Sequence, residues 1–171
     1  MPAGCEEQIA QELSVVTVTG GATRQESVRA ALEVLGPEVD VVLVHDAARP
    51  LAPVALIEAV AAAVLGGAPA VVPGVAVDDT VKRVGADGIV YETPPRETLR
   101  AIQTPQGFRR SVLERAHAQR GASITDDAGL VELLGEPVLV IPGAAEAFKI
   151  TRPDDFARAE ALLASQIGPL T

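Results

Sequence analysis

The sequence predicts an α/β fold in which helices cover a parallel β-sheet. Short runs rich in β-branched residues alternate with longer segments of helical period, which is the pattern that builds such layered folds. The run Val41–Val44 is apolar on both alternating faces, as is typical of a central strand buried beneath helices on either side. The 171 residues are 48% hydrophobic, which suffices for the core of one compact domain over residues 1–171.

Each predicted element follows from its local pattern. Strands are expected where β-branched residues cluster, at 15–19, 39–45, 70–77 and 138–142, with a further strand-like run at 99–103. Helices are expected at about 25–35, 54–65, 110–120, 126–134 and 154–166. The last helix carries one apolar stripe, made of Phe156, Ala159, Leu163 and Ile167.

Residues 79–92 interrupt this rhythm. Two short runs, 80–84 and 89–92, flank the turn sequence Gly85-Ala86-Asp87-Gly88, which predicts an antiparallel hairpin inserted into the layered fold. Such an arm is either a surface flap or a device that clasps a second subunit. Its apolar residues favour the clasp, so we expect 79–92 to be a dimerisation arm. These residues are Val81, Val84, Ile89 and Tyr91.

Composition and charge exclude several classes of function. The formal net charge is −9 and aromatic residues make up 2% of the chain, so the sequence offers neither a basic surface nor a stacking platform for nucleic acid. No run approaches the roughly 20 apolar residues of a membrane span, so a membrane is not an expected partner. The single cysteine, Cys5, excludes an internal disulfide, and residues 1–12 lack a secretory signal, so we expect a cytoplasmic protein.

The strand expected at 39–45 leads directly into His45-Asp46-Ala47-Ala48-Arg49-Pro50. Ligands of open α/β sheets bind at the carboxyl ends of strands, where Asp46 could meet a metal or a substrate hydroxyl and Arg49 an anion. Alternatively, Asp46 caps the following turn and pairs with Arg49 at the surface. The residues alone leave these two interpretations even.

A glycine-containing turn, Gly20-Gly21-Ala22-Thr23, precedes the first strong helical pattern and places Ser27 in its first turn. Free amides at such a helix start could bind an anion or a polar ligand. The commoner role of such a segment is structural, because glycines make turns and polar residues cap helices. The segment matches neither the Walker nor the dinucleotide-binding pattern.

Other polar residues are weaker candidates. The amides of Gln103 and Gln106 could bind a base or a sugar, whereas a lone arginine such as Arg96 is usually solvated. Lys149 stands between Phe148 and Ile150 in a predicted short strand, so its amine must either reach solvent or meet a buried anion.

Two further groups of residues are interpreted as structural rather than catalytic or metal-binding. Thr125-Asp126-Asp127-Ala128 is interpreted first as a helix N-cap with acids in the opening turn, ahead of metal binding. His117 lies among polar residues of a predicted helix and is expected at the surface. With two histidines far apart in the sequence, a histidine-based metal or triad site has little support.

Six segments in this order resemble the 2-C-methyl-D-erythritol 4-phosphate cytidylyltransferase family. They are Gly20–Val28, His45–Pro50, Asp79–Lys82, Gln103–Phe108, Thr125–Ala128 and Phe148–Thr151. The resemblance implies a Rossmann-like nucleotidyltransferase that works as a homodimer with Mg²⁺. It would join CTP and 2-C-methyl-D-erythritol 4-phosphate to give 4-diphosphocytidyl-2-C-methyl-D-erythritol and pyrophosphate, in non-mevalonate isoprenoid biosynthesis.

The resemblance also implies roles for individual residues, carried over position by position. The residues implied to be catalytic, because they position the methylerythritol phosphate, are Arg96 and Lys149. The implied substrate-binding residues are Asp46, Arg49 and Thr80, and Asp46 is also the implied metal ligand. The implied nucleotide-binding residues are Gly20, Gly21, Ser27 and Ala47. Ala22 stands where some members carry an acid.

The family's opening strand, with its glycine-rich loop bearing an arginine and later a lysine for the triphosphate, has no counterpart in residues 1–171. The sequence is therefore expected to represent an N-terminally truncated domain, complete in its acceptor half and incomplete in its CTP half. Two alternatives stay open. One is another sugar-phosphate nucleotidyltransferase, and the other is a non-catalytic dimer that binds a phosphorylated polyol.

Overall fold

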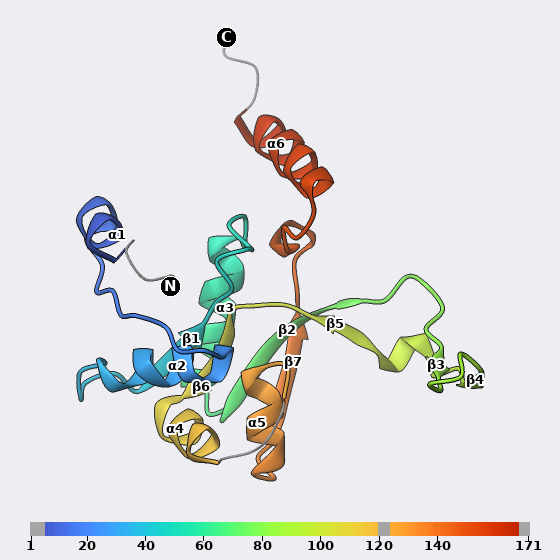
Figure 1. Ribbon diagram of the computed structural model, residues 1–171, viewed down its shortest axis with the longest axis horizontal. Helices are drawn as coiled ribbons and strands as arrows, with labels where there is room; N and C mark the ends of the chain where they lie inside the picture. Colours follow the sequence, from blue (N-terminus) through green and yellow to red (C-terminus); the bar gives the residue numbers. More distant parts are fainter. Residues whose placement is uncertain (1–5, 120–123, 168–171) are drawn as a thin grey trace.

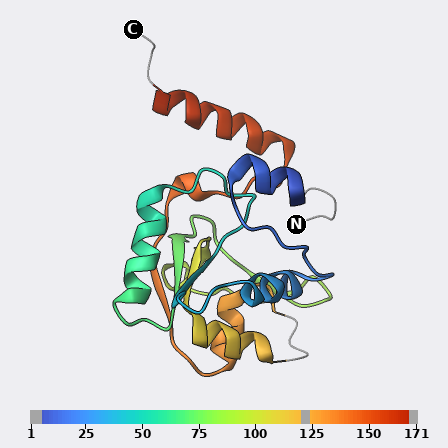
Figure 2. The ribbon, with the colours of Figure 1, turned by 90° about the vertical axis from the view of Figure 1, so that its left-hand side faces the viewer.

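The computed structural model describes residues 6–119 and 124–167, which form a β-sheet with helices on both faces and a separate two-stranded arm (Figures 1 and 2). The α-helices are α1 (Glu6–Leu13), α2 (Arg24–Glu33), α3 (Val54–Leu65), α4 (Arg110–Ala118), α5 (Asp127–Leu133) and α6 (Pro153–Ile167). The strands are β1 (Val41–Val44), β2 (Ala70–Ala76), β3 (Arg83–Val84), β4 (Val90–Glu92), β5 (Arg100–Ile102), β6 (Gln106–Arg109) and β7 (Val138–Pro142). Two short 3-10 helices are η1 (Arg96–Thr98) and η2 (Ala145–Ala147). Within the described ranges, no helix combines the length and the apolar character that crossing a bilayer requires.

The main sheet is mixed. Its strands follow the order β1-β6-β2-β5, and β7 pairs with β2 in parallel. Strand β6 lies antiparallel between β1 and β2, and β5 is also antiparallel to β2. The predicted α/β layering is confirmed, and β1, β2 and β7 share one direction. The predicted parallel sheet is mixed instead, because β5 and β6 run in the opposite direction.

Successive side chains of a strand point to opposite faces of the sheet, so the hydrophobic core consists of two clusters, one on each face. On one face, Ala70, Val72 and Phe108 pack with buried residues of α2, α4 and α5. On the other face, Val71 packs with Val60 and Val64 of α3. The two clusters sit on opposite sides because neighbouring residues of a strand point to opposite faces. The sheet is therefore held between three helices on one side and one on the other.

Two predicted strands differ from the structure. Residues 15–19 form no strand, and Val16 is 82% exposed, because no strand of the described chain pairs with this β-branched run. Strand β1 is not central but outermost in the described sheet, and its four residues are only half-buried. The central position belongs to β2, which pairs on both sides and whose first five residues are buried.

The hairpin predicted at 80–84 and 89–92 is present as β3 and β4, although its ladder is shorter. Arg83 pairs with Glu92 across the ladder, and Gly88 adopts φ = 79°, the left-handed conformation that favours glycine in tight turns. The arm extends away from the sheet in Figure 1. Its apolar side chains are largely exposed, among them Val84, Ile89, Val90 and Tyr91.

Candidate active site

The loop after β1 is fixed in place by hydrogen bonds to the segment between β5 and β6. The amide of Asp46 donates to Thr104 Oγ1 at 3.0 Å, and the same hydroxyl lies 3.0 Å from His45 Nδ1. On the other side of the imidazole ring, His45 Nε2 lies 3.1 Å from the carbonyl oxygen of Arg49, which can only accept. A neutral His45 therefore carries its proton on Nε2 and accepts from Thr104. This chain of contacts fixes the backbone that presents Asp46.

Three charged side chains meet beyond the end of β1. Lys149 Nζ lies 3.0 Å from Asp46 Oδ2, and Arg49 Nε lies 3.7 Å from the same oxygen. Arg49 also donates from Nη1 to the carbonyl oxygen of Ala147 at 2.7 Å. The side chain of Arg49 is 12% exposed, that of Asp46 21% and that of Lys149 45%. The Asp46–Arg49 pair that the sequence allowed is present, and a second cation joins it from the segment after β7.

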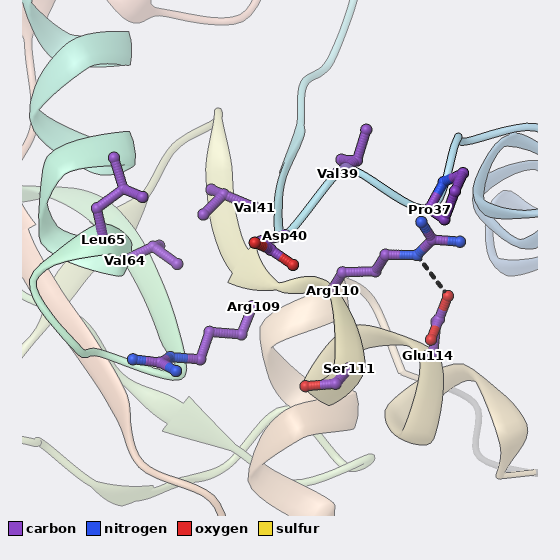
Figure 3. Close-up of a pocket in the computed structure, with 10 residues that line it drawn as sticks. All are labelled: Pro37, Val39, Asp40, Val41, Val64, Leu65, Arg109, Arg110, Ser111 and Glu114. Atoms are coloured by element: carbon purple, nitrogen blue, oxygen red, sulfur yellow. Dashed lines mark hydrogen bonds and ion pairs between the residues drawn. The ribbon is translucent and has the colours of Figure 1, made fainter.

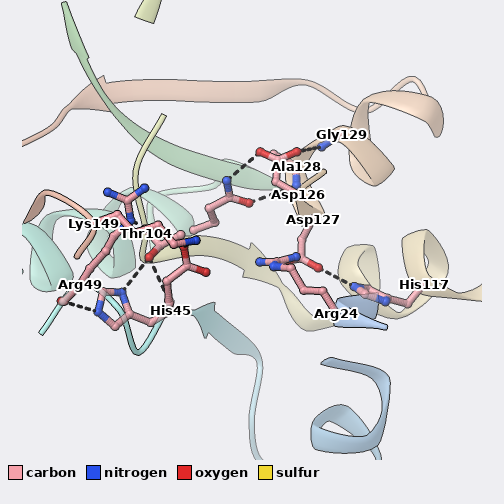
Figure 4. A network of polar contacts seen from close by, with 12 residues as sticks. Arg24, His45, Arg49, Thr104, His117, Asp126, Asp127, Ala128, Gly129 and Lys149 are labelled. Atoms are coloured by element: carbon pink, nitrogen blue, oxygen red, sulfur yellow. Dashed lines mark hydrogen bonds and ion pairs between the residues drawn. The ribbon is translucent and has the colours of Figure 1, made fainter. Parts of the chain in front are cut away.

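These side chains line a cavity of about 400 Å³, and Figure 4 shows the polar contacts that several of its residues make. Its charged lining residues are the cations Arg24, Arg49 and Lys149 and the acids Asp46 and Asp126. Its uncharged lining residues are Ile102, Gln103, Thr104, Gln106 and Thr125. A cavity with clustered cations near a partly exposed carboxylate suits a phosphorylated ligand, because the cations can hold phosphate oxygens.

The side-chain amides of Gln103 and Gln106, which the sequence suggested as ligand-binding groups, form hydrogen bonds within the protein instead. Gln103 donates from Nε2 to the carbonyl oxygen of Ala144 and accepts at Oε1 from the amide of the same residue. Gln106 donates to Asp126 Oδ2 and accepts from the amide of Ala128. Both side chains are buried, so their amides hold loops in place.

The glycine-containing turn before α2 forms a helix cap. Thr23 accepts from the amide of Glu26, and Glu26 accepts in return from the amide of Thr23. The amide of Gly21 donates to Ser27 Oγ at 3.1 Å. A Cβ added to Gly21 would lie 2.2 Å from the Cβ of Glu26, so this close approach requires glycine. The structural role anticipated for this segment is therefore present.

A second cavity, of about 500 Å³, lies between α2 and β1. Of the residues implied to bind the nucleotide, Ser27 and Ala47 line it, whereas Gly20 and Gly21 do not. Arg24 and Asp46 line this cavity as well as the first one, so the two cavities share a wall.

Arg96 and Thr80 lie outside both cavities. Arg96 is exposed at the start of η1 and donates from Nη1 to the carbonyl oxygen of Asp78 at 2.7 Å, which closes the base of the arm. Thr80 is exposed in the arm itself. Within one chain, the structure thus brings Lys149 to Asp46 and Arg49 but does not bring Arg96 or Thr80 to them.

Another cavity, of about 640 Å³, lies at the opposite end of β1 (Figure 3). Its lining includes Asp40, Arg109 and Arg110, and Arg110 pairs with Glu114 at 2.7 Å. No residue implied by the sequence to bind substrate, nucleotide or metal lines it.

Sequence reasoning missed a buried polar chain beside the site. Arg24 Nη2 lies 2.6 Å from Asp127 Oδ2, and His117 Nε2 lies 2.9 Å from Asp127 Oδ1. His117 is buried, so its predicted surface position is wrong. Asp126, as predicted, caps α5 by accepting from the amide of Gly129.

Helical period carried the missing signal. Asp127 precedes Leu130 and Val131 by three and four residues, and His117 follows Leu113 by four, so each polar residue lies on the buried stripe of its helix. Burial alone would raise the pKa of Asp127. Hydrogen bonds from His117 and Arg24 outweigh that effect and hold the pKa of this carboxyl below its usual value.

The sequence matches a known family along nearly the whole chain. Residues 3–165 match the family model of 2-C-methyl-D-erythritol 4-phosphate cytidylyltransferase. The chain belongs to this family. Relatives of the same name from Frankia casuarinae and Streptomyces coelicolor are 63% and 57% identical over 88% and 87% of this chain. The chain spans 56% and 57% of the length of these two relatives.

Solved structures of the cytidylyltransferase family share the fold. The enzyme from Thermus thermophilus is 43% identical with a TM-score of 0.77, over 87% of this chain and 73% of that one. The 4-diphosphocytidyl-2C-methyl-D-erythritol synthase from Anaerococcus prevotii is 31% identical with a TM-score of 0.85, over 95% and 78%. The mixed sheet between helices is therefore the Rossmann-like architecture of this family.

Proposed function

We propose that this chain is a cytidylyltransferase that joins CTP and 2-C-methyl-D-erythritol 4-phosphate, releasing pyrophosphate. The family match supports the reaction, since the relatives carry its name. The observation that carries the proposal is the cluster of Asp46, Arg49 and Lys149 at the mouth of a cavity beyond β1.

The reaction brings anions together. A phosphate oxygen of the polyol attacks the α-phosphorus of CTP in line, and the bond to the β-phosphate breaks as pyrophosphate leaves with that electron pair. Such a transfer needs positioning and positive charge more than a proton-transfer base. Lys149 is the more exposed of the two cations and is assigned to the polyol phosphate. Arg49, held by Asp46 and the Ala147 carbonyl, completes the positive side of the cavity.

Asp46 is the carboxylate to which we assign magnesium. Both oxygens of Asp126 already accept hydrogen bonds, from Gly129 and Gln106, whereas Asp46 is partly exposed at the cavity. Among the described residues, no group of three His, Cys, Asp or Glu side chains could hold a metal ion. One carboxylate fits Mg²⁺, because this ion keeps several waters and takes its other ligands from substrate phosphates. When bound, it would neutralise charge on those phosphates.

The nucleotide is assigned to the second cavity, which adjoins the first. Ser27 from α2 and Ala47 from the loop after β1 line it, and its wall is largely apolar. Gly20 and Gly21 stand at the turn that begins α2 and would contact the nucleotide only through their backbone. This arrangement would place the cytidine beside α2 and direct its phosphates toward Asp46.

A homodimer formed through the arm is the second part of the proposal. Exposed Val84, Ile89, Val90 and Tyr91 leave a two-stranded ribbon without a core of its own, and such a ribbon is marginal in water. Arg96 and Thr80, at and near the base of the arm, cannot act in their own chain's cavity unless the arm moves. We propose that they reach the cavity of a second copy. The reaction is assigned to the cytoplasm, in keeping with the sequence-based expectation.

Equilibrium titration tests this assignment. The chain should bind 2-C-methyl-D-erythritol 4-phosphate, and Lys149→Ala should weaken that binding while Arg115→Ala, an exposed arginine of α4, should not. Preference for a different sugar phosphate would indicate another nucleotidyltransferase. Binding of the polyol phosphate without CTP binding or pyrophosphate release would indicate a non-catalytic binder.

A further inference from the structure

Arg24 begins α2 and reaches toward the centre of the site. Its Nη2 lies 2.6 Å from Asp127 Oδ2, and its side chain is 36% exposed. Asp127 is fully buried and is held from the other side by His117 Nε2 at 2.9 Å. In Figure 4, Arg24 lies between the Asp127–His117 pair and the group that contains Arg49 and Lys149.

The buried pair restrains where the guanidinium can go. A carboxylate without exposure is costly to leave unpaired, so Asp127 holds Arg24 strongly. His117 is itself fixed, because its backbone carbonyl accepts from Arg29 of α2 at 3.0 Å. The guanidinium of Arg24 is therefore preorganised by contacts from α4 and α5.

Arg24 lines both cavities and carries more N–H donors than its contact with Asp127 uses. An arginine carries five N–H groups, and the contact with Asp127 engages one edge of the guanidinium. Arg24 lines both the cavity beyond β1 and the cavity between α2 and β1. Arg49 and Lys149 supply the other positive charges of the first cavity.

We propose that Arg24 binds a phosphate group at the wall shared by the two cavities, with Asp127 as the positioning residue that holds its guanidinium there. The ligand chemistry is a phosphate monoester or a nucleoside triphosphate. The inference deepens the proposed function and rests on it. A purely structural Arg24 would instead tie α2 to α5 and affect stability alone.

The test compares dissociation constants for CTP, cytidine and 2-C-methyl-D-erythritol 4-phosphate. Arg24→Ala should weaken CTP, the polyol phosphate or both on the order of 10- to 100-fold, and leave cytidine unchanged. Loss confined to CTP assigns the contact to the nucleotide, and loss confined to the polyol phosphate assigns it to the acceptor. The dissociation constants of Arg24→Lys should lie between those of the wild type and those of Arg24→Ala. A lysine keeps the positive charge but lacks the planar group that binds Asp127 and a phosphate at the same time.

Arg115→Ala is the control. It removes an exposed arginine of α4 that pairs with Glu136 and lines neither cavity, so affinities should stay unchanged. Asp127→Asn tests positioning: it should weaken phosphate binding in the wild-type background and add nothing in the Arg24→Ala background. Additive losses would show that Asp127 acts independently of Arg24. If Asp127→Asn fails to fold, the affinities of Arg24→Lys and Arg24→Ala still decide whether Arg24 binds phosphate.

The inference and the proposed function fail in different ways. Wild-type binding of CTP and the polyol phosphate with unchanged affinities in Arg24→Ala overturns the inference and leaves the function intact. Binding of inorganic phosphate that depends on Arg24, without selective binding of the polyol phosphate, supports the inference and overturns the function. A wild-type chain that binds none of these compounds overturns both.

Discussion

Lys149 Nζ lies 3.0 Å from Asp46 Oδ2, although one residue follows β7 and the other follows β1. The two strands are separated in the sheet by β2 and β6, so the fold itself brings this pair together. The lysine is 45% exposed and is not locked into the core. A phosphate entering the cavity can therefore replace the carboxylate as its partner at little cost to the fold.

Replacing Lys149 with alanine tests this exchange. We expect the affinity for 2-C-methyl-D-erythritol 4-phosphate to fall by about 1.5–3 kcal/mol, the value of a charged hydrogen bond. The melting temperature should barely change, because a half-exposed ion pair contributes about 0–1 kcal/mol. Isothermal titration and thermal unfolding measure both. Arg152→Ala, an exposed arginine three residues on, is the control. An unchanged dissociation constant for Lys149→Ala would remove this residue from the site.

The arm offers a test of the homodimer. Ile89 is 65% exposed at the arm, so Ile89→Asp should place a charge in the proposed contact and weaken the dimer at least about tenfold. Sedimentation equilibrium gives the dissociation constant. Val54→Asp, a 69% exposed valine at the start of α3, should leave it unchanged. Equal dimer dissociation constants in both variants would show that the dimer contact lies outside the arm.

Local patterns predicted much of this fold and less of its site. Helix α3 and strand β7 have the predicted bounds, because apolar period and β-branched runs are properties of neighbouring residues. Strand β6 was missed, since Gln106 and Gly107 carry little strand propensity and gain their ladder from β1 and β2. The pairing of Asp127 with Arg24 depends on how α2 and α5 pack, which no local pattern specifies.

Subunit mixing tests whether the Arg96 and Lys149 that act in one cavity come from the same chain or from two different chains. If Arg96 acts on the cavity of a second copy, Arg96→Ala and Lys149→Ala dimers each lose tight binding of the polyol phosphate at both sites. In a mixed dimer, one cavity then regains both wild-type residues, so tight sites should return after the variants are unfolded and refolded together. Titration counts these sites. No recovery would place Arg96 in its own chain's cavity or outside the site altogether.

Asp127 should make stability depend on pH. It faces Arg24 from α2 and His117 from α4, with Asp126 beside it on its own element, and its pKa in the folded chain lies below its usual value. An unfolded aspartate has a pKa of about 3.9, so the stabilisation is present above that pH and is lost as pH falls through the lower folded pKa.

Asp127→Asn should therefore lower the free energy of unfolding by about 3–5 kcal/mol at neutral pH, because it leaves the contacts of Arg24 and buried His117 without their charged partner. Urea unfolding from pH 7 down to about pH 2 should show the free energies of unfolding of wild type and variant converging. In acid the wild type loses the stabilisation by the Asp127 charge, which the variant lacks at every pH. Asp155 has a lowered pKa through amides of Thr151 and Arg152, but it is present in both chains and cancels in the difference. A constant gap across the whole range would mean that Asp127 stabilises the fold by packing, not by its charge.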